Sequence, residues 1–267
     1  MGFLANLVPR ILLGFSIVAM AMASGASAQS MSNSSASTKT EALDPSDEGW
    51  HVDVAPYLWF PAVNGTVAAA GHEASTHVPA RDVLSNFDFG IMGLTEIRYN
   101  HLVMPVDFMW VKLSDNKGLP FDQGVDSVHV KINEDILTPK IGYRLVSGNR
   151  FKLDTLIGVR YWHVGTTLTL QPAQISYYGP TNWVDAVQGA RFRVMLAPKV
   201  ELTIAGDAGA GSSRLDYQVV GLLGYKLKRV SLQGGWRYLV IHQNPTSRSF
   251  VNLAMTGVVL GAVIPLK

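Results

Sequence analysis

The 267-residue sequence contains no cysteine and little charge, and each absence excludes a class of protein. Without cysteine the chain forms no disulfide, no thiolate metal site and no cysteine nucleophile. Charged residues make up 16% of the chain, against about a quarter in an average soluble domain. So little charge cannot cover a water-facing surface, and we therefore expect part of the surface to be apolar. The 22 basic and 20 acidic residues give no excess of positive charge for nucleic acid.

Residues 1–28 have the pattern of a secretory signal peptide. Arg10 precedes an apolar run of 13 residues, and Ala26-Ser27-Ala28 matches a cleavage site. The run is too short to span a membrane as a helix. Residues 29–48 are rich in Ser, Thr, Asn and Ala without apolar periodicity, which predicts a disordered leader. We therefore expect an exported chain whose folded domain occupies residues 49–267.

Ten runs of alternating apolar and polar residues follow the leader. In the run 183–196, for example, Val184 and Phe192 share one face, while Asp185 and Arg191 share the other. Such alternation is typical of β-strands that have one wet face and one apolar face. The runs are 50–60, 91–99, 102–114, 125–146, 151–170, 183–196, 199–210, 214–227, 230–242 and 248–264.

The connections between the runs alternate in length. Two-residue and four-residue links alternate with long ones at 61–90, 115–124 and 171–182. Short turns on one side and long loops on the other are typical of bacterial outer-membrane barrels. The sequence therefore predicts an all-β fold, a closed antiparallel transmembrane β-barrel of about ten strands (8 to 12), with both ends on the periplasmic side.

Two local signals refine this layout. In the run 125–146 the apolar residues change from even to odd positions, which predicts a β-bulge near Asn133 to Ile136. Asn64-Gly65 is a hairpin-turn dipeptide, so we expect an additional strand pair in the first long loop.

Alternation alone does not show which face of the strands points outward, because a soluble β-sandwich or barrel has the same period. The low charge favours an apolar exterior in contact with lipid, and a soluble secreted β-sandwich with an aromatic core is the alternative. Aromatic residues near the ends of the apolar faces also predict two interfacial girdles. They are Trp50, Phe60, Tyr99, Trp110, Phe151, Tyr161, Tyr217, Tyr225, Trp236 and Tyr238.

With the apolar face outward, eight acids and eight bases line the lumen. Unpaired buried charge is costly, so we expect these side chains to neutralise one another in a structural network of salt bridges. About ten strands leave a lumen narrow enough for side chains to fill, which argues against a general porin and leaves a narrow channel as an alternative. The lumen set is Asp53, Glu96, Arg98, Asp107, Lys140, Arg144, Asp154, Arg160, Asp185, Arg191, Arg193, Glu201, Asp207, Asp216, Lys226 and Arg237.

Several short motifs resemble small outer-membrane β-barrel proteins of Gram-negative bacteria, of the OmpA and OmpX type. They are Ala55-Pro56-Tyr57-Leu58-Trp59-Phe60-Pro61, Gly158-Val159-Arg160-Tyr161-Trp162, Gly206-Asp207-Ala208-Gly209 and Gly235-Trp236-Arg237-Tyr238-Leu239. The resemblance implies an outer-membrane location, with membrane lipid, lipopolysaccharide and the barrel-assembly machinery as partners. It supplies no reaction and no catalytic residues, and the chain ends in Pro265-Leu266-Lys267 rather than in the usual aromatic residue.

Some small outer-membrane barrels are hydrolases that act on lipids or peptides, and that activity is the enzymatic alternative here. The candidates are Asp115, Asp122, Asp126 and His242, but no spaced catalytic motif joins them. His72 and His77 lack a second pair of ligands for a metal. We therefore expect no catalytic residue, cofactor or metal, and a structural or surface-interaction role for a largely closed barrel.

Overall fold

The computed structural model describes residues 48–69, 72–118, 127–171, 175–243 and 250–266. The predicted signal peptide and the predicted leader up to residue 47 lie outside this part of the chain. One short helix, α2 (Ala80–Ser85), accompanies the strands, and no helix among the described residues is long and apolar enough to cross a membrane. The strands are β1 (Trp50–Ala69), β2 (His72–Val78), β3 (Phe87–Tyr99), β4 (Leu102–Gly118), β5 (Ser127–Ser147), β6 (Phe151–Gln171), β7 (Ile175–Ala197), β8 (Val200–Gly211), β9 (Ser213–Lys226), β10 (Ser231–Gln243) and β11 (Phe250–Pro265).

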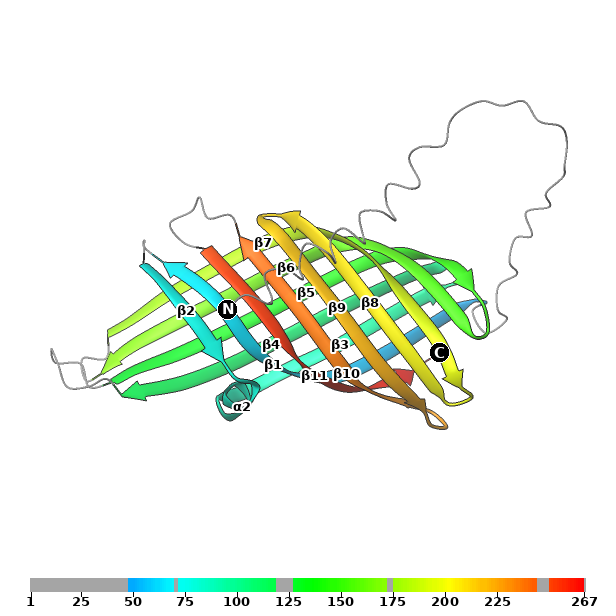
Figure 1. Ribbon diagram of the computed structural model, residues 1–267, viewed down its shortest axis with the longest axis horizontal. Helices are drawn as coiled ribbons and strands as arrows, with labels where there is room; N and C mark the ends of the chain where they lie inside the picture. Colours follow the sequence, from blue (N-terminus) through cyan, green and yellow to red (C-terminus); the bar gives the residue numbers. More distant parts are fainter. Residues whose placement is uncertain (1–47, 70–71, 119–126, 172–174, 244–249, 267) are drawn as a thin grey trace, which may run out of the picture. The chain divides into compact units, whose positions relative to one another are not determined.

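Ten of these strands close into one antiparallel barrel (Figure 1). Each strand from β3 to β10 pairs with the next along the chain, and β1 pairs with both β3 and β11. β2 is not one of these ten strands. Within the described residues it pairs only with the last part of β1, from Val63 to Ala69. The ring confirms the predicted closed barrel of about ten strands and excludes the two packed sheets of a β-sandwich.

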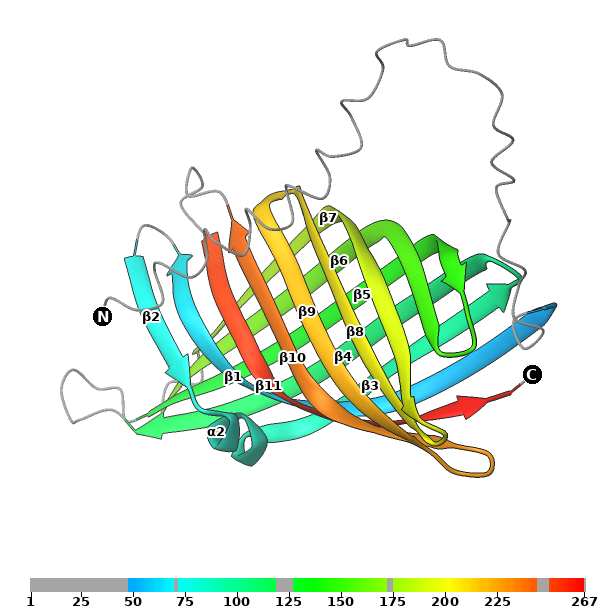
Figure 2. The ribbon, with the colours of Figure 1, turned by 45° about the vertical axis from the view of Figure 1, so that its right-hand side comes forward.

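One end of the barrel, here called the turn end, carries four short connections and both ends of the barrel domain (Figure 2), while the one-residue link between β8 and β9 at Ser212 lies at the opposite end. The strand pairs are joined there by residues 100–101, 148–150, 198–199 and 227–230. The first and last strands meet at the same end, where Asp53 is paired with Pro265. The opposite end is here called the loop end. In outer-membrane barrels the end with the short turns faces the periplasm, and the end with the long loops faces the exterior.

The strands differ in length, and the extra length lies at the loop end. β5, β6 and β7 contain 21, 21 and 23 residues, whereas β8 and β9 contain 12 and 14. The ranges 61–90 and 171–182, which were predicted as long loops, are therefore mostly strand where they are described, and the predicted loop 115–124 begins with four residues of β4 and continues outside the described residues. The prediction was wrong because the extensions lack alternation, as in Ser176–Thr181, although their backbones continue to pair.

The first hairpin has the additional strand that was expected, but its turn lies elsewhere. β1 runs through Asn64 and Gly65, which pair with β2 on one side and β11 on the other. A Cβ on Gly65 would lie 1.9 Å from the carbonyl oxygen of Asn252. The glycine therefore permits the close approach of β11, and Asn64-Gly65 lies inside a strand rather than in a turn.

The predicted bulge near Asn133 to Ile136 is wrong. The ladders from β5 to β4 and to β6 continue without a break across these residues. Ile136 points to the interior, like Thr138 and Arg144 further along the same face of β5. The apparent change of phase is instead a change in the interior, which is polar towards the turn end and beyond it is largely apolar, with Glu134 beside Ile136 on the inward face.

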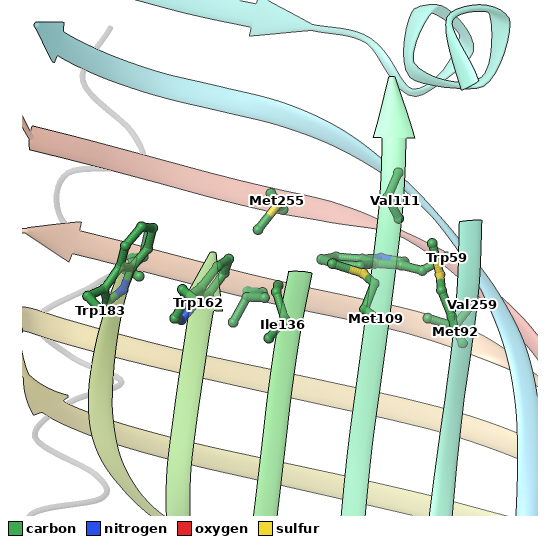
Figure 3. Packing of buried hydrophobic residues seen from close by; sticks show 11 residues of the cluster. Trp59, Met92, Met109, Val111, Ile136, Trp162, Trp183, Met255 and Val259 are labelled. Carbon is green, nitrogen blue, oxygen red and sulfur yellow. The ribbon is translucent and has the colours of Figure 1, made fainter. Parts of the chain in front are cut away.

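An apolar cluster lies in the lumen beyond the polar layer (Figure 3). Trp162 and Trp183 stack there with ring centroids 5.4 Å apart, and Leu239 is completely buried. The assignment of apolar side chains to the outer face alone was therefore incomplete. The buried cluster contains Trp59, Met92, Met109, Val111, Ile136, Trp162, Trp183, Leu239, Ile241, Met255 and Val259.

Candidate functional site in the barrel lumen

The centre of the polar layer is Arg160 on β6, whose side chain is completely buried. Its Nη2 donates to Asp207 Oδ1 at 2.7 Å, its Nη1 donates to Asp216, and its Nε donates to Thr138 Oγ1 at 3.3 Å. Trp162 Nε1 donates to the second oxygen of Asp216 at 3.0 Å. One guanidinium thus joins three strands, and the last bond connects the polar layer to the apolar cluster.

A second group of ion pairs surrounds Asp154, also on β6. Arg144 and Arg191 are its direct neighbours on the flanking strands, so alternation and register together bring the three side chains to one point. Asp154 accepts from Arg144 Nε at 2.8 Å, from Arg191 Nη2 at 2.8 Å and from Arg193 Nη2 at 3.2 Å. Arg191 also donates to Glu96 across the lumen.

A third group lies on the side of the lumen formed by β1, β4 and β10. Tyr57 Oη donates to Asp107 Oδ1 at 2.7 Å and accepts from Arg237 Nη1 at 3.0 Å. Arg237 Nη2 lies 3.1 Å from the other oxygen of Asp107, and its guanidinium covers the ring of Trp59 at 4.8 Å. This group also contacts the apolar cluster, because Trp59 belongs to it.

Thirteen of the sixteen predicted lumen residues make ion pairs in this layer. The other three are placed differently. Asp185 accepts a hydrogen bond from the backbone N–H of Ser213 at 2.7 Å, Glu201 accepts from Thr203 at 3.5 Å, and Lys226 is exposed at the turn end. The thirteen are Asp53, Glu96, Arg98, Asp107, Lys140, Arg144, Asp154, Arg160, Arg191, Arg193, Asp207, Asp216 and Arg237.

The sequence reasoning missed four uncharged members of the layer, namely Tyr57, Thr138, Trp162 and Gln218. Each shares strand parity with a predicted charge: Tyr57 follows Asp53 by four residues, and Gln218 follows Asp216 by two. Gln218 Nε2 donates to Asp207 Oδ2 at 2.6 Å. Parity would have identified all four, because every second residue of a barrel strand faces the lumen.

A cavity of about 640 Å³ lies on the turn-end side of the polar layer. Its walls include the turns 148–150 and 227–230, and Val259 of the apolar cluster bounds it on the inner side. Members of the polar layer such as Tyr57, Arg191 and Asp207 also line it. The cavity therefore extends from the turns between the ion pairs as far as the edge of the apolar cluster.

The outward-facing side chains form an apolar band around the barrel. On β6 the band runs from Phe151 to Tyr161, no outward position between them is charged, and Ile157 at its centre is 60% exposed. About ten residues of strand tilted by about 40° span about 25 Å, the height of the lipid-facing band in outer-membrane barrels. The protein is an integral β-barrel of the bacterial outer membrane.

The band ends in a row of polar residues towards the loop end. Asp135, His163 and Asn182 are paired across β5, β6 and β7. His163 hydrogen-bonds to Asn182, and its Nε2 lies 4.0 Å from Asp135. The change from apolar to polar side chains along these strands marks the outer boundary of the lipid-facing surface.

No protein-family model and no curated protein matches the chain. Its backbone is similar to solved outer-membrane barrels at low sequence identity. The outer-membrane protease OmpT from Escherichia coli is 9% identical, with 85% of this chain and 99% of that chain covered and a TM-score of 0.48. The translocator domain of the autotransporter NalP from Neisseria meningitidis is 13% identical, with 83% and 90% covered and a TM-score of 0.39. An outer-membrane channel from Pseudomonas putida F1 is 11% identical, with 86% and 98% covered and a TM-score of 0.34.

All ten predicted girdle residues occupy outward positions of their strands. Trp50 and Tyr99 lie at the turn end with their ring centroids 4.8 Å apart. Nearer the loop end, the ring centroids of Tyr217 and Tyr238 are 5.9 Å apart, and Trp236 Nε1 donates to Thr256 Oγ1 at 2.7 Å. Phe151 and Tyr225 belong to the turn-end set, and Phe60, Trp110 and Tyr161 belong to the other.

The proposed catalytic candidates do not form a group among the described residues. Asp122 and Asp126 lie outside that part of the chain, and Asp115 is on β4 opposite Val130. His242 is on β10 opposite Asn252, at an outward position like Trp236 and Tyr238. No cluster of potential metal ligands occurs in the ranges that the structure describes.

Proposed function

We propose that this barrel is a non-conducting, non-enzymatic outer-membrane protein with a structural or surface-interaction role at its loop end. The observation that supports the proposal is the set of buried, mutually bonded side chains across the lumen. Arg160 with its two aspartates, and the Trp162–Trp183 pair beside it, occupy the middle of the barrel. A solute that entered from the turn end would have to displace these buried side chains in order to pass.

The energetics of the polar layer support a fixed closure. Arg160, Asp154 and Asp216 are completely buried, so separating them would leave charge without a partner in a medium of low dielectric constant. The direct contacts between this layer and the apolar cluster at Trp162 and Trp59 oppose movement of either layer alone.

The long strands support a role at the cell surface. Both β6 and β7 extend beyond the polar row at His163 and Asn182. β6 continues to Gln171, and β7 begins at Ile175 and pairs with this extension. These extensions carry paired strand surface past the lipid-facing band, where it meets the outer leaflet and the medium. Lipopolysaccharide is therefore the first partner expected along this wall.

A narrow ion channel is the alternative that one observation favours. The turn-end cavity reaches Asp107 and Asp207 in the polar layer, so an ion needs a path only through the remaining half of the lumen. Hydrolytic activity has less support, because His242 faces outward and has no ion pair with a described carboxylate.

Liposome swelling tests the proposal. Proteoliposomes of the purified barrel, diluted into isosmotic solutions of small sugars and amino acids, are expected to swell no faster than protein-free liposomes. A general porin in the same lipid gives the positive control. Swelling that depends on solute size would reject the closed barrel and favour the channel.

A further inference from the structure

Four basic side chains line the turn-end cavity where it reaches the turns. All four are exposed, and within the described part of the chain none of them makes an ion pair. Like charges around an opening with walls of low dielectric constant concentrate the field and attract groups of the opposite sign. The four, here called the mouth bases, are Arg150, Lys226, Lys228 and Arg229.

Backbone hydrogen bonds hold the turns that carry these bases beside one another. The N–H of Met195 donates to the carbonyl oxygen of Arg150 at 2.8 Å. The N–H of Lys226 donates to the carbonyl oxygen of Lys199 at 2.8 Å, and Lys199 is also exposed. The positive charge therefore extends over three successive turns, those that follow β5, β7 and β9, and forms one surface on the rim.

The chain enters the barrel at the same end. The N–H of Gly49 donates to Asn100 Oδ1 at 2.9 Å, and the N–H of Asn100 donates to the carbonyl oxygen of Gly49 at 3.4 Å. Gly49 has a φ of +80°, which glycine adopts without strain. These bonds fix the start of β1 to the turn between β3 and β4, so the residues that precede it leave from the rim of the barrel.

Those preceding residues are acidic. The segment 41–47, which lies outside the described residues, reads Glu41-Ala42-Leu43-Asp44-Pro45-Ser46-Asp47 and contains three acids and no base. Seven extended residues span at most about 25 Å, and a barrel of ten tilted strands is about 20 Å across. The segment is therefore long enough to reach the mouth bases from Gly49.

We propose that residues 41–47 dock on the mouth bases, with the carboxylates of Glu41, Asp44 and Asp47 as the groups that pair with them. Exposed ion pairs are individually weak, but a segment tethered at the same rim meets its site at a high effective concentration. The tether is the reason to assign the site to this segment rather than to a separate acidic peptide. The inference does not depend on the proposed closure of the lumen, because the mouth bases lie at the turns and not in the polar layer.

A distance measurement between two spin labels tests the docking. The chain has no native cysteine, so Ala42→Cys and Ala197→Cys direct one label to the acidic segment and one to the rim without removing a charge. Ala197 is exposed and does not line the cavity. Pulsed electron resonance of the purified, exported barrel in neutral detergent is expected to give one dominant, narrow distance that is shorter than the barrel is wide.

Charge reversal then tests whether ion pairs cause this distance. Lys228→Glu with Arg229→Glu is expected to lower the ratio of docked to undocked chains about tenfold. Adding Asp44→Lys and Asp47→Lys to the same chain is expected to restore the narrow distance, because the signs are then exchanged. Unheated detergent gels verify that each variant is folded.

A matched control reverses two exposed bases at the other end of the barrel. Arg81→Glu with Lys131→Glu changes the net charge equally, and both residues lie towards the loop end. The distance between the two labels is expected to be unchanged in this variant.

Three results would overturn the proposal. The first is a broad distribution of distances in the labelled chain that the reversal of Lys228 and Arg229 does not alter. The second is a loss of the narrow distance that the exchanged charges fail to restore, or that the loop-end control shares. The third is a short distance that disappears when the labelled chain is diluted with unlabelled chain, which would assign the mouth bases to the acidic segment of another molecule.

Discussion

At the scale of single residues, the stability of the barrel depends on charges that have no contact with water. Arg160 holds two carboxylates from β8 and β9 and is itself completely buried. A buried pair of this kind adds less stability than its geometry suggests, because desolvation of both partners opposes their attraction. Removal of one partner is much more costly, since the other remains buried and charged.

Arg160→Gln is therefore expected to lower the free energy of unfolding by about 3–5 kcal/mol. Equilibrium unfolding in guanidinium chloride, followed by tryptophan fluorescence in lipid vesicles, gives the measurement. Arg81→Gln is the control, because the Arg81–Asp82 pair on α2 is largely exposed and contributes less than about 1 kcal/mol. Equal effects of the two substitutions would contradict the structural role of Arg160.

Two glycines on neighbouring strands offer a second matched pair. A Cβ on Gly235 would lie 1.9 Å from the carbonyl oxygen of Gly221, whereas a Cβ on Gly221 would meet nothing within 4 Å. Gly235→Ala is expected to destabilise the barrel by about 1–3 kcal/mol, and Gly221→Ala by about 0.5 kcal/mol or less. The same unfolding experiment compares the two losses of stability. A larger loss for Gly221→Ala than for Gly235→Ala would contradict the close contact between β9 and β10 at Gly235.

At the scale of strands, the outer wall is a graded surface. Ile157 lies in the middle of the lipid-facing band, and Asn182 belongs to the polar row at its edge. Arginine at the centre of such a band costs about 2–4 kcal/mol, and near the boundary about 0–1 kcal/mol. Ile157→Arg is thus expected to destabilise the barrel in phospholipid vesicles much more than Asn182→Arg. Similar losses would place the lipid boundary elsewhere.

The strands could be predicted from the sequence where one face meets lipid and the other meets the polar layer. In β7, alternation identifies Asp185, Arg191 and Arg193 as inward and Phe192 as outward, and the structure agrees. In this part of the strand the inward residues are polar and the outward residues are apolar, so the two-residue alternation is visible in the sequence.

The strands could not be predicted where the two faces are alike. On the inward face of β5, Ile136 belongs to the apolar cluster and Ile132 is apolar, with Glu134 between them, so the sequence resembles a strand that has changed phase. Beyond Asn182 the sequence of β7 contains Gly179 and Pro180 and no alternation, so it resembles a loop. The apolar cluster and the tall wall at the loop end were hidden for this reason, and the partners of each lumen charge depend on register, which alternation does not give.

At the scale of the whole molecule, the two ends of the barrel are expected to lie on opposite sides of the membrane. The chain has no native cysteine, so a single introduced thiol reports its own location. Arg81→Cys on α2 is expected to react with a membrane-impermeant maleimide on intact cells, and Lys228→Cys at the turn end only after the outer membrane is opened. Labelling of Lys228→Cys in intact cells would reverse the orientation.

The closed lumen is the central claim, and single-channel recording in planar lipid bilayers tests it most directly. With the polar layer and the apolar cluster in place, the unmodified barrel is expected to produce no stepwise conductance, while a general porin in the same bilayer conducts. Reproducible stepwise openings of the purified, fully folded barrel would contradict the claim and show that ions pass between the side chains around Arg160.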